Sequence, residues 1–113
     1  MRESHVHLQR LPLKVLIITS CTGEKAVEHS DALTLADFKQ GAAHIAPREA
    51  SLGDMMTAAA DLYTGQQHVR LMRGVKAFRE ARPTNGAGPA LDLHILSAGY
   101  GMVHGSRELA PYE

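Results

Sequence analysis

Two loop-like segments of this chain carry residue types that can bind an anion or assist acid–base chemistry. The first, residues 20–25, combines hydroxyls, a thiol, a glycine and a lysine directly after a β-branched run. Backbone N–H groups and an ammonium can converge on a phosphate in such a loop, although the P-loop spacing G-x-x-x-x-G-K-[ST] is absent. An ordinary turn with a solvated lysine is the alternative. The candidates are Ser20, Cys21, Thr22 and Gly23 for phosphate or nucleotide binding, and Lys25 for catalysis, as the cation that stabilises an oxyanion or a phosphate.

The second segment, residues 97–101, ends an alternating apolar run in Ser-Ala-Gly-Tyr-Gly. A tyrosine ring can stack on a nucleobase, and hydroxyls and loop amides can bind a sugar or a phosphate. A tight turn whose tyrosines cover the core explains the same residues without any ligand. The candidates are Ser97 and Tyr100 for catalysis, with the tyrosine as an acid, and Gly99, Gly101 and Tyr112 for nucleotide binding.

A third set of candidates is basic. Arg70, Arg73, Lys76 and Arg79 recur every three positions in a segment with helical periodicity. This spacing predicts a tilted basic stripe that can follow a nucleic-acid backbone, each phosphate contact adding salt-dependent affinity. A solvated face paired to acids is the alternative, and Glu80 is the one acid close enough in the sequence to pair with it.

Thiol and metal chemistry have less support. Cys21, the single cysteine, needs a neighbouring base to act as a nucleophile, and a small buried side chain is its more ordinary role. His5 and His7 could chelate, but the other histidines are scattered, with no H-E-x-x-H or C-x-x-C spacing. His94 alternates with apolar residues and is predicted to be hydrogen-bonded in the interior or at an edge. We therefore expect no metal site and no cofactor.

Two strand-like runs frame the chain. Residues 13–20 are apolar on both faces, which is typical of a central strand of a parallel sheet covered on both sides, and residues 91–97 alternate. No hairpin signal is present, and the long helical crossover between the runs predicts parallel pairing. Ligands collect beyond the carboxyl ends of such strands. The two candidate loops are therefore expected to form one pocket.

The crossover is predicted to contain two or three helices. The first is expected over residues 32–40, capped by Ser30 or Asp31 and ended by Gly41. Pro47 and the candidate cap Ser51 are expected to separate it from a second helical pattern, over residues 55–63.

The last helix is expected over residues 66–81, with Leu71, Val75 and Phe78 as its buried stripe. Residues 83–89 are rich in proline and glycine and predict a loop before the second strand.

These elements predict an α/β fold: a small parallel sheet with a helical crossover, forming an incomplete or minimal Rossmann-like three-layer unit. Residues 1–12 are polar and aperiodic and are expected to form a flexible N-terminal arm, and residues 13–113 a single α/β domain. Two strands make a small sheet. We therefore expect either a domain truncated at its C-terminus, or a homo-oligomer or partner chain that completes the sheet.

Composition narrows the functional classes. The 113 residues carry 12 basic and 12 acidic side chains, which excludes a globally basic nucleic-acid binder but not a local basic patch. The single cysteine fits a reducing compartment. No segment approaches the roughly 20 apolar residues of a membrane span. A cytoplasmic protein without a membrane partner is expected.

Four motifs in the same order resemble the peroxide-stress YaaA family and its short uncharacterised relatives. They are Ser20-Cys21 with Lys25, Leu62-Tyr63-Thr64-Gly65, Ile95 to Val103, and Ala110-Pro111-Tyr112. The resemblance implies a cytosolic α/β protein with a positively charged cleft and a tendency to bind DNA under oxidative stress, and it adds Tyr63 and Gly65 to the nucleotide-binding candidates. It covers neither residues 1–12 nor most of residues 26–52, and the longer relatives continue well past the Pro-Tyr.

The residues and the resemblance together support three hypotheses. The first is a nucleic-acid- or nucleotide-directed protein that binds phosphate and base at the strand-end loops, with Tyr63 or Tyr100 stacking on the base. The second is an enzyme that acts on a nucleoside glycosidic bond in nucleic-acid modification or phage defence. The third is a split domain that is inactive without a partner chain. No Asp or Glu occupies an obvious catalytic place, so the residues do not decide whether the chain is an enzyme.

Overall fold

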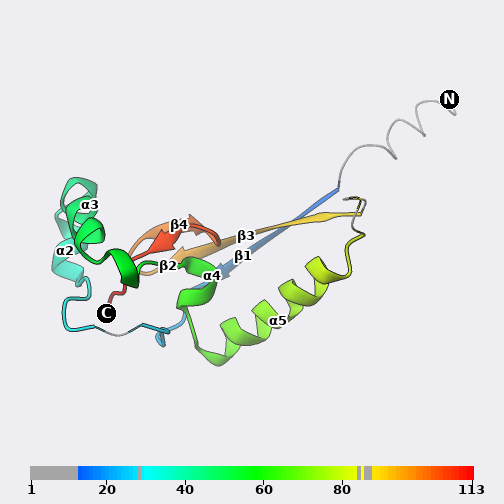
Figure 1. Ribbon diagram of the computed structural model, residues 1–113, viewed down its shortest axis with the longest axis horizontal. Coiled ribbons are helices and arrows are strands. Elements are labelled where there is room, and N and C mark those ends of the chain that lie inside the picture. Colours follow the sequence, from blue (N-terminus) through cyan, green and yellow to red (C-terminus); the bar gives the residue numbers. More distant parts are fainter. Residues whose placement is uncertain (1–12, 28, 84, 86–87) are drawn as a thin grey trace, which may run out of the picture.

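The computed structural model describes residues 13–27, 29–83, 85 and 88–113, and the predicted N-terminal arm lies outside these residues. Its centre is a three-stranded sheet in the order β1 (Lys14–Ser20), β3 (Ala90–Ser97) and β4 (Gly101–His104). Figure 1 shows β1 and β3 side by side along the long axis of the molecule. The predicted mixture of helices and strands in an α/β fold is confirmed.

The parallel pairing of the two strand-like runs is also confirmed. β1 pairs with β3 in parallel, from Lys14 opposite Ala90 to Ser20 opposite Leu96. Both strands end at the same edge of the sheet, so the loops that follow them leave the sheet together.

The prediction of a purely parallel sheet is wrong, because the chain forms a hairpin for which the sequence shows no signal. β4 folds back on β3 in antiparallel pairing, with Ser97 opposite Gly101 and His94 opposite His104. The turn uses Gly101 at a φ of +78°, a left-handed conformation that glycine adopts at little cost. The turn residues are Ala-Gly-Tyr rather than a two-residue pair such as Asn-Gly, so the usual hairpin signal is missing from the sequence.

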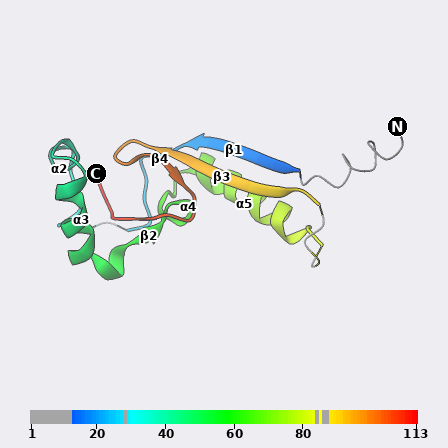
Figure 2. The same cartoon turned by 90° about the horizontal axis from the view of Figure 1, so that it is seen from above.

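α5 (Gln66–Glu80) confirms the helix predicted over residues 66–81. Val75 is buried, and Leu71 and Phe78 are partly buried. Figure 2 shows this helix along one face of β1 and β3. None of the helices in the described part combines the length and the apolar surface that crossing a bilayer requires.

The opposite face of the sheet is uncovered in the described part of the chain, which corrects the expectation of a central strand covered on both sides. β1 is an edge strand, and its Leu16 and Ile18 are 58% and 59% exposed. Leu96 and Met102 extend this apolar surface across β3 and β4, and we call the four residues the open face. A strand that is apolar on both faces predicts a covering layer on each face. The pattern does not predict which segment, of this chain or of another, supplies that layer. The three-layer unit therefore stays a proposal.

The helix predicted over residues 32–40 is shorter in the structure. α2 (Leu35–Lys39) begins after Thr34, which forms a reciprocal capping box with Asp37. The sequence predicted Ser30 or Asp31 as the cap of this helix. The cap is Thr34 instead, because the helix begins later than predicted.

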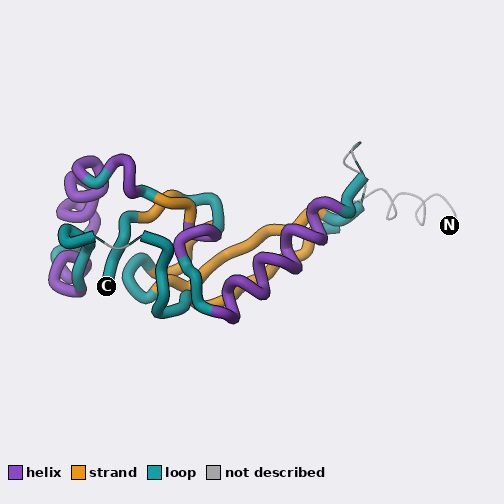
Figure 3. Tube along the Cα trace, turned by 60° about the horizontal axis from the view of Figure 1, so that its bottom comes forward, coloured by secondary structure: helices purple, strands orange, loops and turns teal. Residues whose placement is uncertain are grey.

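The break predicted at Pro47 is absent, because α3 (Ala42–Ser51) continues through this proline. Ser51 is the last residue of α3 and not the cap of a following helix. α3 is tied to α2 at Asp37, which accepts from His44 Nε2 at 2.8 Å. This hydrogen bond, followed by the one from the Thr34 backbone, lowers the pKa of Asp37 to about 2. Figure 3 shows α2 and α3 at one end of the molecule and α5 reaching toward the other.

The single helical pattern predicted over residues 55–63 is also wrong. The segment contains a 3-10 turn (Gly53–Met55), the two-residue strand β2 (Thr57–Ala58) and the short helix α4 (Ala59–Leu62). β2 pairs antiparallel with β5 (Glu108–Leu109). Pairing with the distant tail therefore overrides the local helical periodicity.

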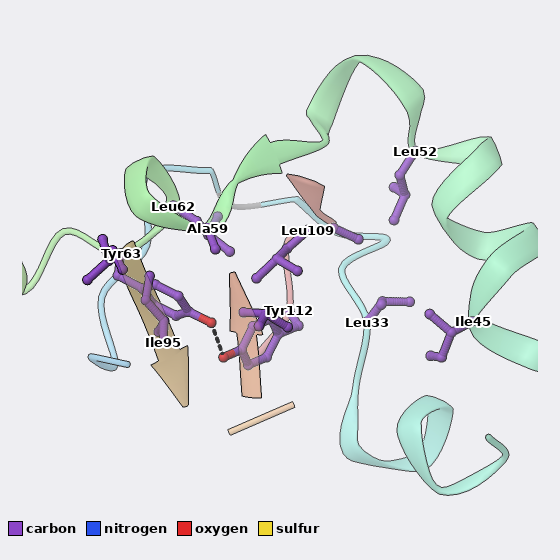
Figure 4. Close-up of a cluster of buried hydrophobic side chains, with 12 residues drawn as sticks. Leu33, Ile45, Leu52, Ala59, Leu62, Tyr63, Ile95, Leu109 and Tyr112 are labelled. Carbon is purple, nitrogen blue, oxygen red and sulfur yellow. Dashed lines mark hydrogen bonds between the residues drawn. The ribbon is translucent and has the colours of Figure 1, made fainter. Parts of the chain in front are cut away.

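The core gathers around the carboxyl end of β3. Figure 4 shows Leu62, Ile95 and Leu109 in one cluster with the two tyrosines, and Leu33 extends this cluster toward α3. The tail joins this core through an isolated pairing of Tyr112 with Leu33. The strand-end loops are therefore supported by the most buried part of the molecule.

Candidate functional site

The loops after β1 and β3 lie against each other, as parallel pairing predicts. The Cys21 amide donates to the Leu96 carbonyl at 3.0 Å, and the Ala98 amide donates to Cys21 Sγ at 3.2 Å. The partly buried thiol of Cys21 thus joins the two loops as an acceptor. Ser20 is exposed at the end of β1.

The junction before α5 packs against the first loop. The Gly65 amide donates to Thr22 Oγ1 at 3.0 Å. A Cβ on Gly65 would lie 2.5 Å from the Thr22 Cβ, so the approach of the two segments leaves room for glycine alone. These two candidates therefore fix how the loops meet.

Lys25 lies where the first loop meets Tyr63, with which it forms an isolated antiparallel bridge. Its Nζ donates to the Gly23 carbonyl at 3.2 Å and lies 4.4 Å from the centroid of the Tyr112 ring. Among the described residues, no carboxylate lies within ion-pair distance of it. Neutral groups therefore hold the ammonium, and no acid among the described residues neutralises its charge.

Lys25 lines a cleft of about 600 Å³. The other lining residues come from the segment around it and from the tail: Gly23, Val27, His29, Ser30, Ala32, Tyr112 and Glu113. His29 Nδ1 accepts the Asp31 amide at 3.0 Å, which leaves Nε2 to carry the proton of a neutral ring. We call this the Lys25 cleft. Its lining residues carry an ammonium, an imidazole and a hydroxyl, and they include the acidic residue Glu113.

His29 and Ser30 are cleft residues that the sequence predictions missed. The sequence presents Ser30 as a helix cap and His29 as one of several scattered histidines. The sequence signal that could have identified them is their position four and five residues after Lys25, in a segment with no clear periodicity. Such a segment is a loop, and loops at strand ends carry binding residues.

Ser97, Tyr63 and Tyr112 form a buried group of three hydroxyls, which we call the hydroxyl cluster. Tyr63 Oη donates to Ser97 Oγ at 2.9 Å, and the Tyr112 Oη lies 2.7 Å from that of Tyr63 and 2.8 Å from Ser97 Oγ. Figure 4 shows the contact between the two tyrosines. The Tyr100 amide also donates to Ser97 Oγ, at 3.1 Å. Every hydroxyl of the cluster therefore has partners inside the protein.

Burial sets the properties of Tyr63. It raises the pKa of the phenol above its ordinary range, so the hydroxyl stays protonated. Tyr63 is only 2% exposed and presents no free ring face on which a base can stack. The structure therefore places Tyr63 in the support of the loops.

Tyr100 lies away from the Lys25 cleft. Its hydroxyl donates to Glu49 at 2.8 Å and accepts the Ala110 amide at 2.9 Å, and Arg107 lies over its ring. It lines a separate cavity of about 410 Å³ beside α3, together with Gly99. Burial is the main cause that raises the pKa of Tyr100 to about 12, which makes this phenol a weaker acid near neutral pH.

The three predicted catalytic residues thus occupy three surroundings. Lys25 is in its cleft, Ser97 is in the hydroxyl cluster, and Tyr100 is beside α3. Tyr112 connects the first two, since its ring lies under the ammonium and its hydroxyl contacts Ser97. Neither of the two cavities contains all three residues.

The basic residues of α5 lie on a different surface. All four are exposed, and in the described part of the chain no ion pair contains any of them. Steps of three residues fall short of a full helical turn, so the row winds across the exposed side from Arg70 to Arg79. Figure 1 shows α5 running from the strand-end loops toward the other end of the sheet. The row therefore leads away from the cleft.

Comparison of the chain with family models, with curated proteins and with solved structures gave no match.

Proposed function

We propose that the chain binds the phosphate of a nucleotide or nucleic acid in the Lys25 cleft. The observation that carries the proposal is the Lys25 ammonium, which lines a cleft at the carboxyl end of a parallel strand and has no carboxylate partner among the described residues. Ligands of open α/β sheets bind at this edge. An ammonium held by a carbonyl and a ring face has little conformational freedom to lose when it meets a phosphate.

His29 and Ser30 add two donors to the same cleft, an imidazole N–H and a hydroxyl. The four-motif resemblance to YaaA-type peroxide-stress proteins supports a nucleic-acid-directed role. The proposal narrows the earlier hypothesis, because Tyr63 is buried and Tyr100 lies outside the cleft. The phosphate, rather than a stacked base, is the part of the ligand that these residues recognise.

We expect Lys25→Ala to weaken binding of AMP at least about tenfold, since a hydrogen bond to a charged group is worth about 1.5–3 kcal/mol. Isothermal titration with AMP, adenosine and inorganic phosphate measures this, and adenosine is expected to bind more weakly than AMP. Lys14→Ala is the matched control, because it removes the same charge at the other end of β1. Wild-type affinity in the Lys25 variant would contradict the proposal.

A second titration, with an oligonucleotide, separates the α5 surface from the cleft. A labelled single-stranded oligonucleotide is followed by fluorescence anisotropy at several salt concentrations. The pair Arg73→Glu and Lys76→Glu is expected to weaken this probe and to flatten its salt dependence while leaving AMP binding unchanged. Unchanged oligonucleotide binding would make the basic row an ordinary solvated surface.

An enzyme acting on a nucleoside glycosidic bond is the second candidate function, favoured by Glu113, an acidic residue that lines the same cleft as Lys25. Glycosidic-bond cleavage commonly uses carboxyl groups for proton transfer. Release of free adenine from AMP during the titrations, followed by chromatography, separates this candidate from binding alone.

We also propose that a second copy of the chain completes the sheet by pairing along the outer edge of β1. The outer edge of β1 has no neighbouring strand in the described structure, and an apolar edge strand of this kind is a template for pairing. Leu16→Glu with Ile18→Lys is expected to convert a concentration-dependent oligomer to a monomer in sedimentation equilibrium. Val69→Lys is the control, because Val69 is an exposed apolar residue on α5. A monomeric wild type at all concentrations would contradict this proposal.

A further inference from the structure

Two histidines and an aspartate meet on the open side of the sheet, away from the Lys25 cleft. Asp92 and His94 alternate along β3, and His104 of β4 is the cross-strand partner of His94. We call these three residues the sheet triad. One donor atom from each lies within 4.8 Å of the others.

The two histidines contact the two oxygens of one carboxylate. His94 Nε2 lies 3.2 Å from Asp92 Oδ2, and His104 Nε2 lies 2.7 Å from Oδ1 of the same carboxylate. The two rings meet edge to face with centroids 5.1 Å apart. Strand pairing fixes this arrangement. Asp92 and His94 are two residues apart on β3 and therefore share a face, and His104 lies opposite His94 on the same face of β4.

We propose that the sheet triad binds a borderline divalent cation, with Zn²⁺ as the preferred ion. Two imidazole nitrogens and one carboxylate are a donor set that such cations take, and three protein ligands leave further positions for water or another ligand. The side chains of His94, His104 and Asp92 are 31%, 46% and 27% exposed, so an ion reaches them from solvent.

His104 also has the outer partner that a metal ligand requires. A metal-binding histidine donates its second ring N–H to a neighbouring oxygen. Ser106 Oγ lies 2.7 Å from His104 Nδ1 and can accept that proton once Nε2 binds the ion. The Ser106 amide donates to the same nitrogen at 3.1 Å, so Nδ1 is an acceptor in this structure. Binding of an ion at Nε2 therefore requires this exposed contact to give way to the one with the Ser106 hydroxyl.

The pair of Asp37 and His44 shows what distinguishes the sheet triad. Its distance is similar, with His44 Nε2 2.8 Å from Asp37 Oδ1. Its third member is Arg48, whose guanidinium lies 3.2 Å from the same oxygen. A guanidinium has no lone pair for a metal and repels a cation, so this pair is a matched negative control.

Isothermal titration of Zn²⁺ into the full chain without an affinity tag tests the proposal. We expect one ion per chain, and at least about tenfold weaker binding in His104→Gln and in Asp92→Asn, since even outer partners of metal ligands contribute 10–100-fold. His44→Gln is expected to bind like the wild type. Far-ultraviolet circular dichroism confirms that each variant is folded.

Co²⁺ gives a second measurement, because its visible absorption reports coordination by protein ligands. Ser106→Ala keeps all three ligands and is expected to retain the Co²⁺ spectrum with reduced affinity. His5→Gln with His7→Gln tests the other pair of histidines in the sequence. Zn²⁺ binding that survives His104→Gln, or that disappears only in the His5/His7 variant, overturns the proposal. Because AMP binding does not depend on the sheet triad, failure here leaves the Lys25 cleft unaffected.

Discussion

Gly65→Ala is expected to lower the free energy of unfolding by about 3 kcal/mol, the sum of forced overpacking and a strained hydrogen bond. The new methyl carbon would lie 2.5 Å from the Cβ of Thr22 and 2.8 Å from its Cγ2 and Oγ1. The nearest of these atoms is attached directly to the backbone, so a side-chain rotation does not relieve the contact. The loop of Thr22 must move away, and with it the hydrogen bond from the Gly65 amide.

Urea denaturation measures this loss, and a thermal midpoint lower by more than about 10 °C is expected for a domain of this size. Gly23→Ala is the matched control, because it lies in the same loop and a Cβ there contacts nothing within 4 Å. A change below about 0.5 kcal/mol is expected for it.

A double-mutant cycle identifies the cause. In a Thr22→Gly background the clash disappears, so Gly65→Ala should cost much less there than in the wild type. An equal cost in both backgrounds would show that the close approach of these loops is not what requires glycine. The loop also carries Lys25, so the single Gly65 variant is expected to bind AMP more weakly as well.

The sequence predicted the elements whose periodicity is strong. The run over residues 13–20, the alternation over 91–97 and the apolar stripe of residues 66–81 all appear as β1, β3 and α5. Parallel pairing followed from the length of the crossover, because two strands joined by some seventy residues of mostly helical chain cannot form a tight hairpin. These predictions depend on local pattern and chain length.

What the sequence did not predict depends on distant partners. β2 exists because the tail pairs with it. Pro47 is a separate case, since α3 continues through this residue although proline disfavours a position inside a helix. The missed hairpin had the largest consequence. Without β4 opposite β3, His94 and His104 are ten residues apart with no recognisable metal spacing, and the sheet triad is invisible.

The candidate site was predicted in part for the same reason. The strand ends brought Cys21 beside Ala98, as parallel pairing requires. The side chains that share a cavity are determined by their rotamers and by where the tail packs. Tyr112 therefore joins Lys25 to the hydroxyl cluster, while Tyr100, two residues after Ala98, turns toward α3.

Ser97→Ala is expected to lower the free energy of unfolding by about 2–3 kcal/mol, because it leaves buried donors without an acceptor. Ser97 is 3% exposed and accepts from both the Tyr63 hydroxyl and the Tyr100 amide. The two tyrosines can still bond to each other, but the amide and one hydroxyl lose their partner. Tyr63→Phe should cost less, about 1 kcal/mol, because Ser97 then still accepts the amide and contacts Tyr112.

Ser20→Ala is the control for this comparison, since Ser20 ends β1 as Ser97 ends β3 but is exposed. Its stability is expected to stay within about 0.5 kcal/mol of the wild type. The order of the variants in urea denaturation, with Ser97→Ala more destabilised than Tyr63→Phe, tests whether Ser97 is the centre of the hydroxyl cluster. AMP titration of the folded Ser97→Ala protein then separates a supporting role from a role in ligand binding. Wild-type affinity with reduced stability makes Ser97 a supporting residue, whereas lost affinity with wild-type stability makes it part of the ligand site.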